Sequence, residues 1–286
     1  MWIAFAFGSA FFAGVTAILA KCGIEKTDST VATALRTIVV LLFSWLMVFV
    51  VGSQDQLGSI DGKTWCFLIL SGLSTGASWL FYFRALQLGD IHKVVPIDKS
   101  STFLSILLAA LILGEPIGGI QALSILVMAV GTYWMIQKPQ KEVSGEKGNR
   151  WFFFAVASAV FASLVAILGK IGIEGVESNL GTALRTGVVL LMAWLMIPVQ
   201  KKTGAIRNIP RRELLFIFLS GIATGASWLC YYRALQEGPA GIVAPIDKLS
   251  ILVTIFFARV VFHEKLGRKE MWGLLLIVVG TLGLLL

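Results

Sequence analysis

The hexapeptide TGASWL occurs twice in the sequence, first as Thr75–Leu80 and again as Thr224–Leu229. Both copies lie inside long apolar stretches, and the second follows the first by 149 positions. The same shift aligns the two halves of the chain without a gap, with roughly four positions in ten identical. Because many of the shared residues are polar, apolar composition alone does not explain the match. The chain therefore consists of two homologous halves.

The composition assigns the chain to the membrane. Of its 286 residues, 57% are hydrophobic and 14% are charged, whereas a soluble domain has roughly 25% charged residues. A helix that crosses the hydrocarbon core needs roughly 20 mainly apolar residues. We expect ten such spans in an all-α membrane protein, at residues 2–22, 31–51, 64–87, 94–113, 117–137, 151–171, 181–200, 213–236, 242–262 and 269–286.

The longest polar segment, KPQKEVSGEKGNR at residues 138–150, separates the ten predicted spans into two groups of five. We interpret it as a cytoplasmic linker between a first repeat at residues 1–137 and a second repeat at residues 151–286. Because five is odd, the second copy enters the membrane from the opposite side, which predicts two inverted five-helix repeats. Secondary transporters are often built in this way, with the substrate site near the midplane where the repeats meet.

Charges in the predicted loops orient the chain. When the charges shared by both repeats are set aside, the remaining basic residues fall on one side, and the other side keeps essentially Lys63. The basic side holds the linker cations together with Lys26, Lys93, Lys201, Lys202, Arg207, Arg211, Arg212, Lys265, Arg268 and Lys269. The positive-inside rule makes this side cytoplasmic and both termini external, in a bacterial-type cytoplasmic membrane. The net charge of +8 is then a matter of topology, and we predict no nucleic-acid partner.

A polar stripe marks the fourth predicted span of each half. Helical spacing gives one face to Asp98, Ser101, Thr102 and Ser105, and the second half keeps Asp247, Ser250 and Thr254 in register. Either the stripe lines a water-filled cavity, or each aspartate caps a helix whose first turn holds Pro96 or Pro245. A cap explains the aspartate but not the hydroxyls that follow it. We predict that the two aspartates bind substrate or protons.

Two pairs of basic residues are further candidates. Lys99 and Lys248 follow the aspartates and lie about 100° away around the helix. Each either pairs with an acid on another helix, contacts an anionic substrate group, or extends to the membrane interface. Arg36 and Arg185 lie early in the second span of each half. Because arginine stays protonated, each requires an acid, a group of carbonyls or an anion.

The third span of each half combines small and aromatic residues. Gly72-x-x-x-Gly76 recurs as Gly221-x-x-x-Gly225, a spacing that lets two helices pack closely. One helical face beside it carries Ser78, Trp79 and Tyr82, repeated as Ser227, Trp228 and Tyr231. Aromatic residues with polar tips suit either a substrate pocket or a belt at the membrane interface.

The two five-helix repeats share three further features. Each second span has an early arginine, a Leu-Gly-Glu turn lies at Glu115 (Glu264 in the copy), and each fifth span has a late glycine, Gly131 or Gly280. In these features the chain resembles EamA-type members of the drug/metabolite transporter superfamily. We expect the two glutamates to cap or brace the short turn in which they lie. The resemblance implies a ten-helix transporter with a central cavity between the repeats, which moves a small solute by exchange or with a proton gradient.

From these features we predict a secondary-active transporter of a small polar or amphiphilic metabolite that works by alternating access. The alternatives are a lipid flippase and a membrane-embedded lipid-modifying enzyme. An enzyme would need a cluster of His, Asp or Glu near the interface, and the sequence indicates none. We therefore predict no enzymatic activity, no cofactor and no metal. The expected partners are the solute and the lipid bilayer, with the chain either a monomer or a homodimer.

Overall fold

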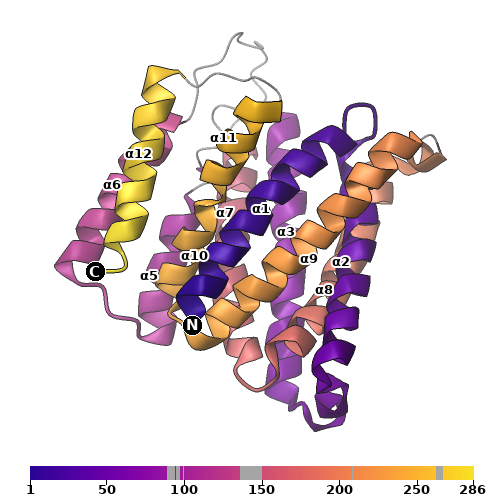
Figure 1. Cartoon of the computed structure of the whole chain (residues 1–286), viewed down its shortest axis with the longest axis horizontal. Helices are drawn as coiled ribbons and strands as arrows, with labels where there is room; N and C mark the ends of the chain where they lie inside the picture. Colours follow the sequence, from indigo (N-terminus) through magenta and orange to yellow (C-terminus); the bar gives the residue numbers. More distant parts are fainter. Residues whose placement is uncertain (89–93, 95–96, 99, 136–149, 208, 262–266) are drawn as a thin grey trace.

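The structure is a computed structural model of the whole chain, and it describes all residues except 89–93, 95–96, 99, 136–149, 208 and 262–266 (Figure 1). Every regular element among the described residues is a helix. Those of the first half are α1 (Trp2–Gly23), α2 (Ser29–Val51), η1 (Ser53–Ser59), α3 (Gly62–Leu88), α5 (Ser101–Leu113) and α6 (Gly119–Met135). Those of the second half are α7 (Arg150–Ile173), α8 (Ser178–Val199), η2 (Thr203–Arg207), α9 (Arg211–Glu237), α10 (Ala240–Lys248), α11 (Ser250–Val261) and α12 (Arg268–Gly283).

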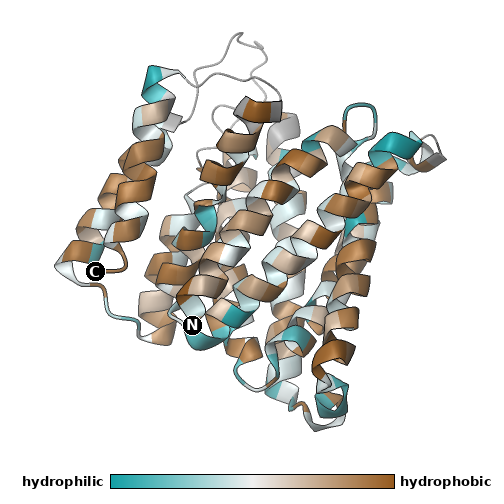
Figure 2. Ribbon diagram, in the orientation of Figure 1, coloured by the Kyte–Doolittle hydropathy of each residue, from teal (hydrophilic) through white to brown (hydrophobic). Residues whose placement is uncertain are grey.

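The helices have the length and composition of an integral membrane protein. Seven candidate spans among the described residues are long and apolar enough to cross a bilayer, and three shorter apolar helices accompany them at Ser101–Leu113, Gly119–Trp134 and Met271–Gly283. Apolar residues run along the helices, while hydrophilic residues gather near the two ends of the bundle (Figure 2). The prediction of an all-helical membrane protein is confirmed.

Helices of one half pack against helices of the other. α1 lies along α9, and α3 makes an equally extensive contact with α7 (Figure 1). The 149-residue shift converts one of these pairs into the other. In the first pair, Ser9 lies beside Ser227 near one end. At the other end, the Glu213 carboxylate accepts hydrogen bonds from the backbone N–H groups of Lys26 and Thr27. The two helices therefore run in opposite directions.

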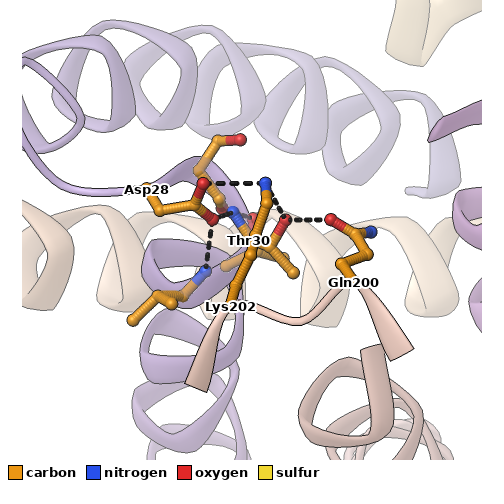
Figure 3. Close-up of polar contacts among 7 residues, drawn as sticks. Asp28, Thr30, Gln200 and Lys202 are labelled. Atoms are coloured by element: carbon orange, nitrogen blue, oxygen red, sulfur yellow. Dashed lines mark hydrogen bonds and ion pairs between the residues drawn. The ribbon is translucent and has the colours of Figure 1, made fainter. Parts of the chain in front are cut away.

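Helices that occupy equivalent positions in the two halves also form antiparallel pairs. The start of α2 lies at the end of α8, where Asp28 and Lys202 form an ion pair of 2.7 Å and Thr30 donates to Gln200 at 2.8 Å (Figure 3). In the α6/α12 pair, a Cβ added at Gly131 would lie 2.7 Å from the carbonyl oxygen of Gly273. Farther along the pair, a Cβ added at Gly280 would lie 2.7 Å from the carbonyl oxygen of Ser124, so α6 and α12 run in opposite directions.

Asp28 explains why α2 begins where it does. Its carboxylate accepts hydrogen bonds from the backbone N–H groups of Thr30 and Val31, which α2 itself leaves unbonded. Burial raises the pKa of Asp28, but the hydrogen bond and charge of Lys202 together with the two amides outweigh it, so that the pKa lies below its ordinary value. The carboxylate therefore stays ionised at neutral pH and holds the two helix ends together.

The sequence predicts that Glu115 braces its own turn. In the structure it connects the two halves instead. Its carboxylate oxygens accept hydrogen bonds from the backbone N–H groups of Ala240, at 2.6 Å, and Gly241, at 2.7 Å. Those amides start α10, whose N-cap residue Pro239 makes no side-chain capping bond. Glu264, the counterpart in the second half, lies outside the described residues.

Replacing Glu115 with alanine should lower the stability of the protein by about 1–3 kcal/mol, because two charge-assisted bonds to a helix N-terminus are lost. The measurement is thermal unfolding of the purified protein in detergent. Glu25→Ala is the matched control, because Glu25 is exposed and substitutions at such positions usually change stability by less than about 0.5 kcal/mol. Equal melting temperatures for the two variants would contradict the bridging role of Glu115.

Candidate functional site

The fourth span of the second half is broken near its middle. α10 ends at Lys248 and α11 begins at Ser250. Leu249, between them, donates its N–H to the carbonyl of Ile246 at 2.9 Å, and Leu252 donates to the carbonyl of Leu249 at 2.9 Å. An α-helix bonds each N–H to the carbonyl four residues earlier, so these bonds form a tighter turn. The span expected over 242–262 corresponds to Ala240–Phe257, which is long and apolar enough to cross a membrane and contains this tighter turn at Leu249.

The first half carries the same break at the equivalent position. Ser100 donates its N–H to the carbonyl of Ile97 at 3.1 Å, and Phe103 donates to the carbonyl of Ser100 at 3.0 Å. Each donor and acceptor lies 149 positions before its counterpart in the second half. The same pair of hydrogen bonds thus follows Asp98 in the first half and Asp247 in the second.

The helix-cap interpretation of Asp247 is wrong. α10 begins at Ala240, so Pro245 lies inside the helix and Asp247 lies in its last turn. The first amides of α10 are bonded by Glu115 instead. Pro96, the equivalent proline of the first half, lies outside the described residues.

Each of the two aspartates accepts a hydrogen bond from a serine of the other half. Ser9 of α1 donates to Oδ1 of Asp247 at 2.6 Å. Ser227 of α9 donates to the carbonyl of Ser9 at 3.1 Å, and the two hydroxyl oxygens are 3.3 Å apart. Ser9 is completely buried, so this contact lies inside the bundle where α1, α9 and α10 meet.

A related arrangement surrounds Asp98, in which the hydroxyl of Ser158 also lies within hydrogen-bond distance of the carbonyl of Ser78, at 3.1 Å. Ser158 of α7 donates to Oδ1 of Asp98 at 2.9 Å, and its hydroxyl lies 3.4 Å from that of Ser78. Ser158 is also completely buried. We did not single out Ser9 or Ser158 from the sequence, although each is a serine in an apolar first span that recurs at the 149-residue interval. The recurrence of this serine in both halves was the sequence signal that could have identified the two residues.

The hydroxyls that follow the aspartates mainly bond to their own helices. Ser105 donates to the carbonyl of Ser101 at 2.9 Å, and Thr254 donates to the carbonyl of Ser250 at 3.0 Å. Thr102 and Ser105 are buried, whereas Ser101, Ser250 and Thr254 are half-buried. Their backbone bonds do not assign them to a cavity, and the cavity-lining role stays a prediction.

Arg185 is held deep inside the bundle by hydroxyls and aromatic rings. Its Nε donates to Ser71 Oγ at 3.0 Å and its Nη2 donates to Thr75 Oγ1 at 2.5 Å. The guanidinium carbon lies 5.1 Å from the ring centroid of Trp228 and 4.9 Å from that of Tyr232. Its side chain makes no ion pair with any described acid, and its Nη1 atom is buried without a hydrogen-bond partner.

Arg36, the counterpart of Arg185, is in a different state. It is half-buried and has no hydrogen bond or ion pair with the described part of the chain. Ser220 and Thr224 stand where Ser71 and Thr75 stand around Arg185. Neither accepts a described hydrogen bond from Arg36. Ser220 donates to the backbone carbonyl of Ile217 at 2.8 Å, and Thr224 donates to that of Ser220 at 2.7 Å, as Thr75 does to that of Ser71. The two halves therefore carry the same hydroxyl residues near each arginine, but among the described residues only Arg185 donates hydrogen bonds to them.

The remaining candidates are distributed over several parts of the bundle. Trp228 lies beside Arg185 and packs against buried core residues, and its place in a substrate pocket stays a prediction. Trp79 packs on a cluster formed by α2 and α8, and Tyr82 packs on one that includes α7. Tyr231 lies within electrostatic range of both Asp247 and Arg185. Lys248 is exposed, and Lys99 lies outside the described residues.

Comparisons with known proteins agree with this architecture. The model of the EamA-like transporter family matches residues 1–137 and again residues 149–286. An uncharacterised transporter of Sinorhizobium sp., from the cobO 3′ region, is 43% identical over 132 residues, which cover 46% of this chain and 94% of that protein. A probable 4-amino-4-deoxy-L-arabinose-phosphoundecaprenol flippase subunit, ArnE of Pseudomonas aeruginosa, is 31% identical over 102 residues, which cover 36% of this chain and 89% of ArnE.

One solved structure shares the fold. It is described only as "Crystal structure of protein", and it superposes with a TM-score of 0.77 at 18% sequence identity. The match covers 98% of this chain and 94% of the other. The two bacterial relatives match over nearly all of their own length but over less than half of this chain. Each is therefore comparable in size to one of the two repeated halves.

Proposed function

Because the chain belongs to the EamA-like transporter family, we propose that it carries a small polar or amphiphilic solute across the cytoplasmic membrane by alternating access. The energy comes from a proton gradient or from exchange of solutes. The observation that carries the proposal is the pair of aspartates beside broken fourth spans, each hydrogen-bonded by a serine of the other half. Ionisable groups at membrane depth are typical of transport sites where repeats meet.

We propose that the two halves are inverted relative to one another. The equivalent helices α2 and α8 run antiparallel, as do α6 and α12. A two-fold axis along the membrane normal would instead make equivalent helices parallel, so the observed directions favour an axis in the membrane plane. Both termini lie at the same end of the bundle, opposite the start of α9 (Figure 1). By the charges of the loops, we place the termini outside and the start of α9 in the cytoplasm.

The different states of the two arginines support alternating access. Alternating access in inverted repeats works when two similar halves take different conformations and later exchange them. The hydroxyls of Ser71 and Thr75 accept hydrogen bonds from the guanidinium of Arg185, whereas the equivalent hydroxyls of Ser220 and Thr224 accept no described hydrogen bond from Arg36. In the exchanged state, we expect Arg36 to bind Ser220 and Thr224.

Asp98→Asn and Asp247→Asn should each reduce transport about 10- to 30-fold, because loss of a charged hydrogen-bonding group is worth roughly 1.5–2 kcal/mol. The solute is first found by a thermal-shift screen of purified protein against metabolites. Its uptake is then measured in proteoliposomes with and without a pH gradient. Asp55→Asn is the control, because Asp55 is exposed in η1. Full activity in both test variants would contradict the assignment of the aspartates.

A lipid flippase is the second candidate, and the similarity to a subunit with that described role favours it. The two functions differ in what they move: a flippase transfers a lipid between leaflets, whereas a metabolite transporter accumulates a soluble compound inside a vesicle. Reconstitution with a fluorescent lipid, followed by chemical bleaching of the outer leaflet, distinguishes them. Complete bleaching only when the protein is present, with no uptake of soluble solutes, would favour the flippase.

A further inference from the structure

We propose that Arg185 forms a binding site for an anionic group, a carboxylate or a phosphate ester, on the transported substrate. The inference rests on the proposed transport function and adds to it the chemical class of the substrate. It concerns a residue of α8 and not of the fourth spans, although Tyr231 lies within electrostatic range of both Arg185 and Asp247.

No acid in the described part of the chain forms an ion pair with Arg185. The side chain is 2% exposed, and its contacts among the described residues are two hydroxyls and two aromatic rings. Arginine does not lose its proton in proteins, and a buried charge that is unpaired is costly. Within a membrane this cost favours a functional explanation over a purely structural one. An anionic ligand would supply the missing charge.

Neighbouring groups fix the guanidinium and leave its Nη1 group without a hydrogen-bond partner among the described residues. Ser71 Oγ accepts from Arg185 and donates its own proton to the carbonyl of Val165, at 3.0 Å. Thr75 Oγ1 also accepts from Arg185 and donates to the carbonyl of Ser71, at 3.1 Å. Both hydroxyl protons are thus engaged, so these residues position the arginine. The Nη1 group, buried without a partner, is left to donate to an anion.

The aromatic rings restrict how a ligand can approach. Trp228 and Tyr232 lie within cation–π distance of the guanidinium. Both rings belong to α9 and are four residues apart, so they lie on one face of that helix. A guanidinium can bind a carboxylate or phosphate through two parallel N–H groups. Because the guanidinium of Arg185 is enclosed in this conformation, we expect the anion to reach it when the second half opens. A site that is closed in one state and open in the other fits a transported group.

Gly169 and Tyr232 are two residues of the second half that shape the surroundings of Arg185. A Cβ added at Gly169 would lie 2.7 Å from Cε1 of Tyr232 and 3.3 Å from Ser71 Oγ. Glycine therefore lets α7 approach the tyrosine closely. The equivalent positions of the first half hold Ala20 and Phe83, so the tyrosine and its matching glycine belong to the second half alone. The surroundings of Arg185 are thus specialised and are not a simple copy.

The test compares soluble anions with a lipid phosphate. Purified full-length protein in phosphatidylcholine nanodiscs is melted with increasing phosphate, acetate or succinate at constant ionic strength, and with glycerol and acetamide as neutral probes. A parallel series includes phosphatidic acid in the nanodisc. We expect saturable stabilisation by at least one anionic probe and none by the neutral ones. A response to phosphatidic acid but not to soluble anions would assign the site to a lipid headgroup.

Substitutions connect the response to Arg185. We expect Arg185→Gln to raise the half-saturating anion concentration at least about tenfold, the equivalent of about 1.4 kcal/mol. Arg185→Lys keeps the charge and should give a smaller increase, which covers the case in which the glutamine variant does not fold. Arg233→Gln is the control, because Arg233 pairs with Glu237 at 2.7 Å at the end of α9 and is half-buried. It should respond as the wild type does.

Two results would overturn the inference. The first is no saturable stabilisation of the wild type by any anionic probe, and the second is a wild-type anion response in both Arg185→Gln and Arg185→Lys. The proposed transport function is judged separately by uptake into proteoliposomes. Uptake of a neutral or cationic solute without an anion response would remove the anion site and leave the transporter. Anion binding that depends on Arg185, without transport of any compound, would support the site and contradict the transport function.

Discussion

Replacing Gly8 with cysteine should create a disulfide with the native Cys230 and stop transport until a reductant is added. A Cβ at position 8 would lie 4.0 Å from Cβ of Cys230 and 3.5 Å from its sulfur, and disulfides have Cβ–Cβ distances of about 3.5–4.5 Å. Position 8 is in α1 and Cys230 is in α9, so the bond would join the two halves. It would also fix Ser9, which donates to Asp247. If α1 and α9 must separate during the cycle, transport should fall at least about tenfold.

A gel assay measures the crosslink directly. Cys22 and Cys66 are first replaced by serine, and a protease site is inserted within residues 138–149. After oxidation and cleavage, the two halves should migrate together on a non-reducing gel and separately after reduction. Gly8→Cys with Cys230→Ser is the control, and its halves should always separate. Failure to crosslink would contradict the packing of α1 on α9, whereas a complete crosslink with undiminished transport would contradict the proposed mechanism.

The membrane fold was predictable because lipid imposes strong constraints on sequence. A spanning segment must be apolar and must satisfy its backbone hydrogen bonds internally, so long apolar stretches indicate helices. Polar residues inside such stretches are rare, and their recurrence at a fixed interval, as in Arg36 and Arg185, indicated a duplication. The contact of Gly72 with α8 confirms the packing expected from the Gly-x-x-x-Gly spacing.

The contacts of the site were less accessible to sequence reasoning. The hydrogen bond from Ser9 to Asp247 joins residues 238 positions apart and depends on how α1 crosses the second half. The break at Leu249 coincides with neither a proline nor a glycine, so no local residue marked it. Glu115 was expected to act within its own turn, but its partners are the first amides of α10. Each of these contacts is decided by tertiary packing between distant segments.

The two arginines show a further limit of sequence reasoning. Arg36 and Arg185 lie in the same pentapeptide, Thr-Ala-Leu-Arg-Thr, yet one guanidinium is engaged by hydroxyls and the other is not. Identical local sequences cannot by themselves predict different contacts. The difference arises from the conformation of the whole bundle, together with local changes such as glycine rather than alanine at position 169. A two-state transporter is expected to differ between its halves in this way.

Replacing Gly72 with leucine should destabilise the protein and impair transport, because Gly72 lies where α3 packs closely on α8. A Cβ there would lie 2.7 Å from Cβ of Val188 and 3.1 Å from the carbonyl oxygen of Arg185. Neither atom can move without its backbone, so the helices must separate, which typically costs about 1–3 kcal/mol. Separation would also withdraw Arg185 from Ser71, its partner on α3.

Gly187→Leu is the matched control for this prediction. A Cβ at Gly187, also on α8, meets no atom within 4 Å. Both substitutions gain about 0.8–1 kcal/mol of helix propensity, so the difference between their melting temperatures isolates the packing cost. Gly72→Leu should melt at a lower temperature than Gly187→Leu and should lose the anion response assigned to Arg185, whereas Gly187→Leu should retain it. Equal melting temperatures would show that α3 and α8 do not pack as closely as the structure has them, and the position of Arg185 between them would lose its basis.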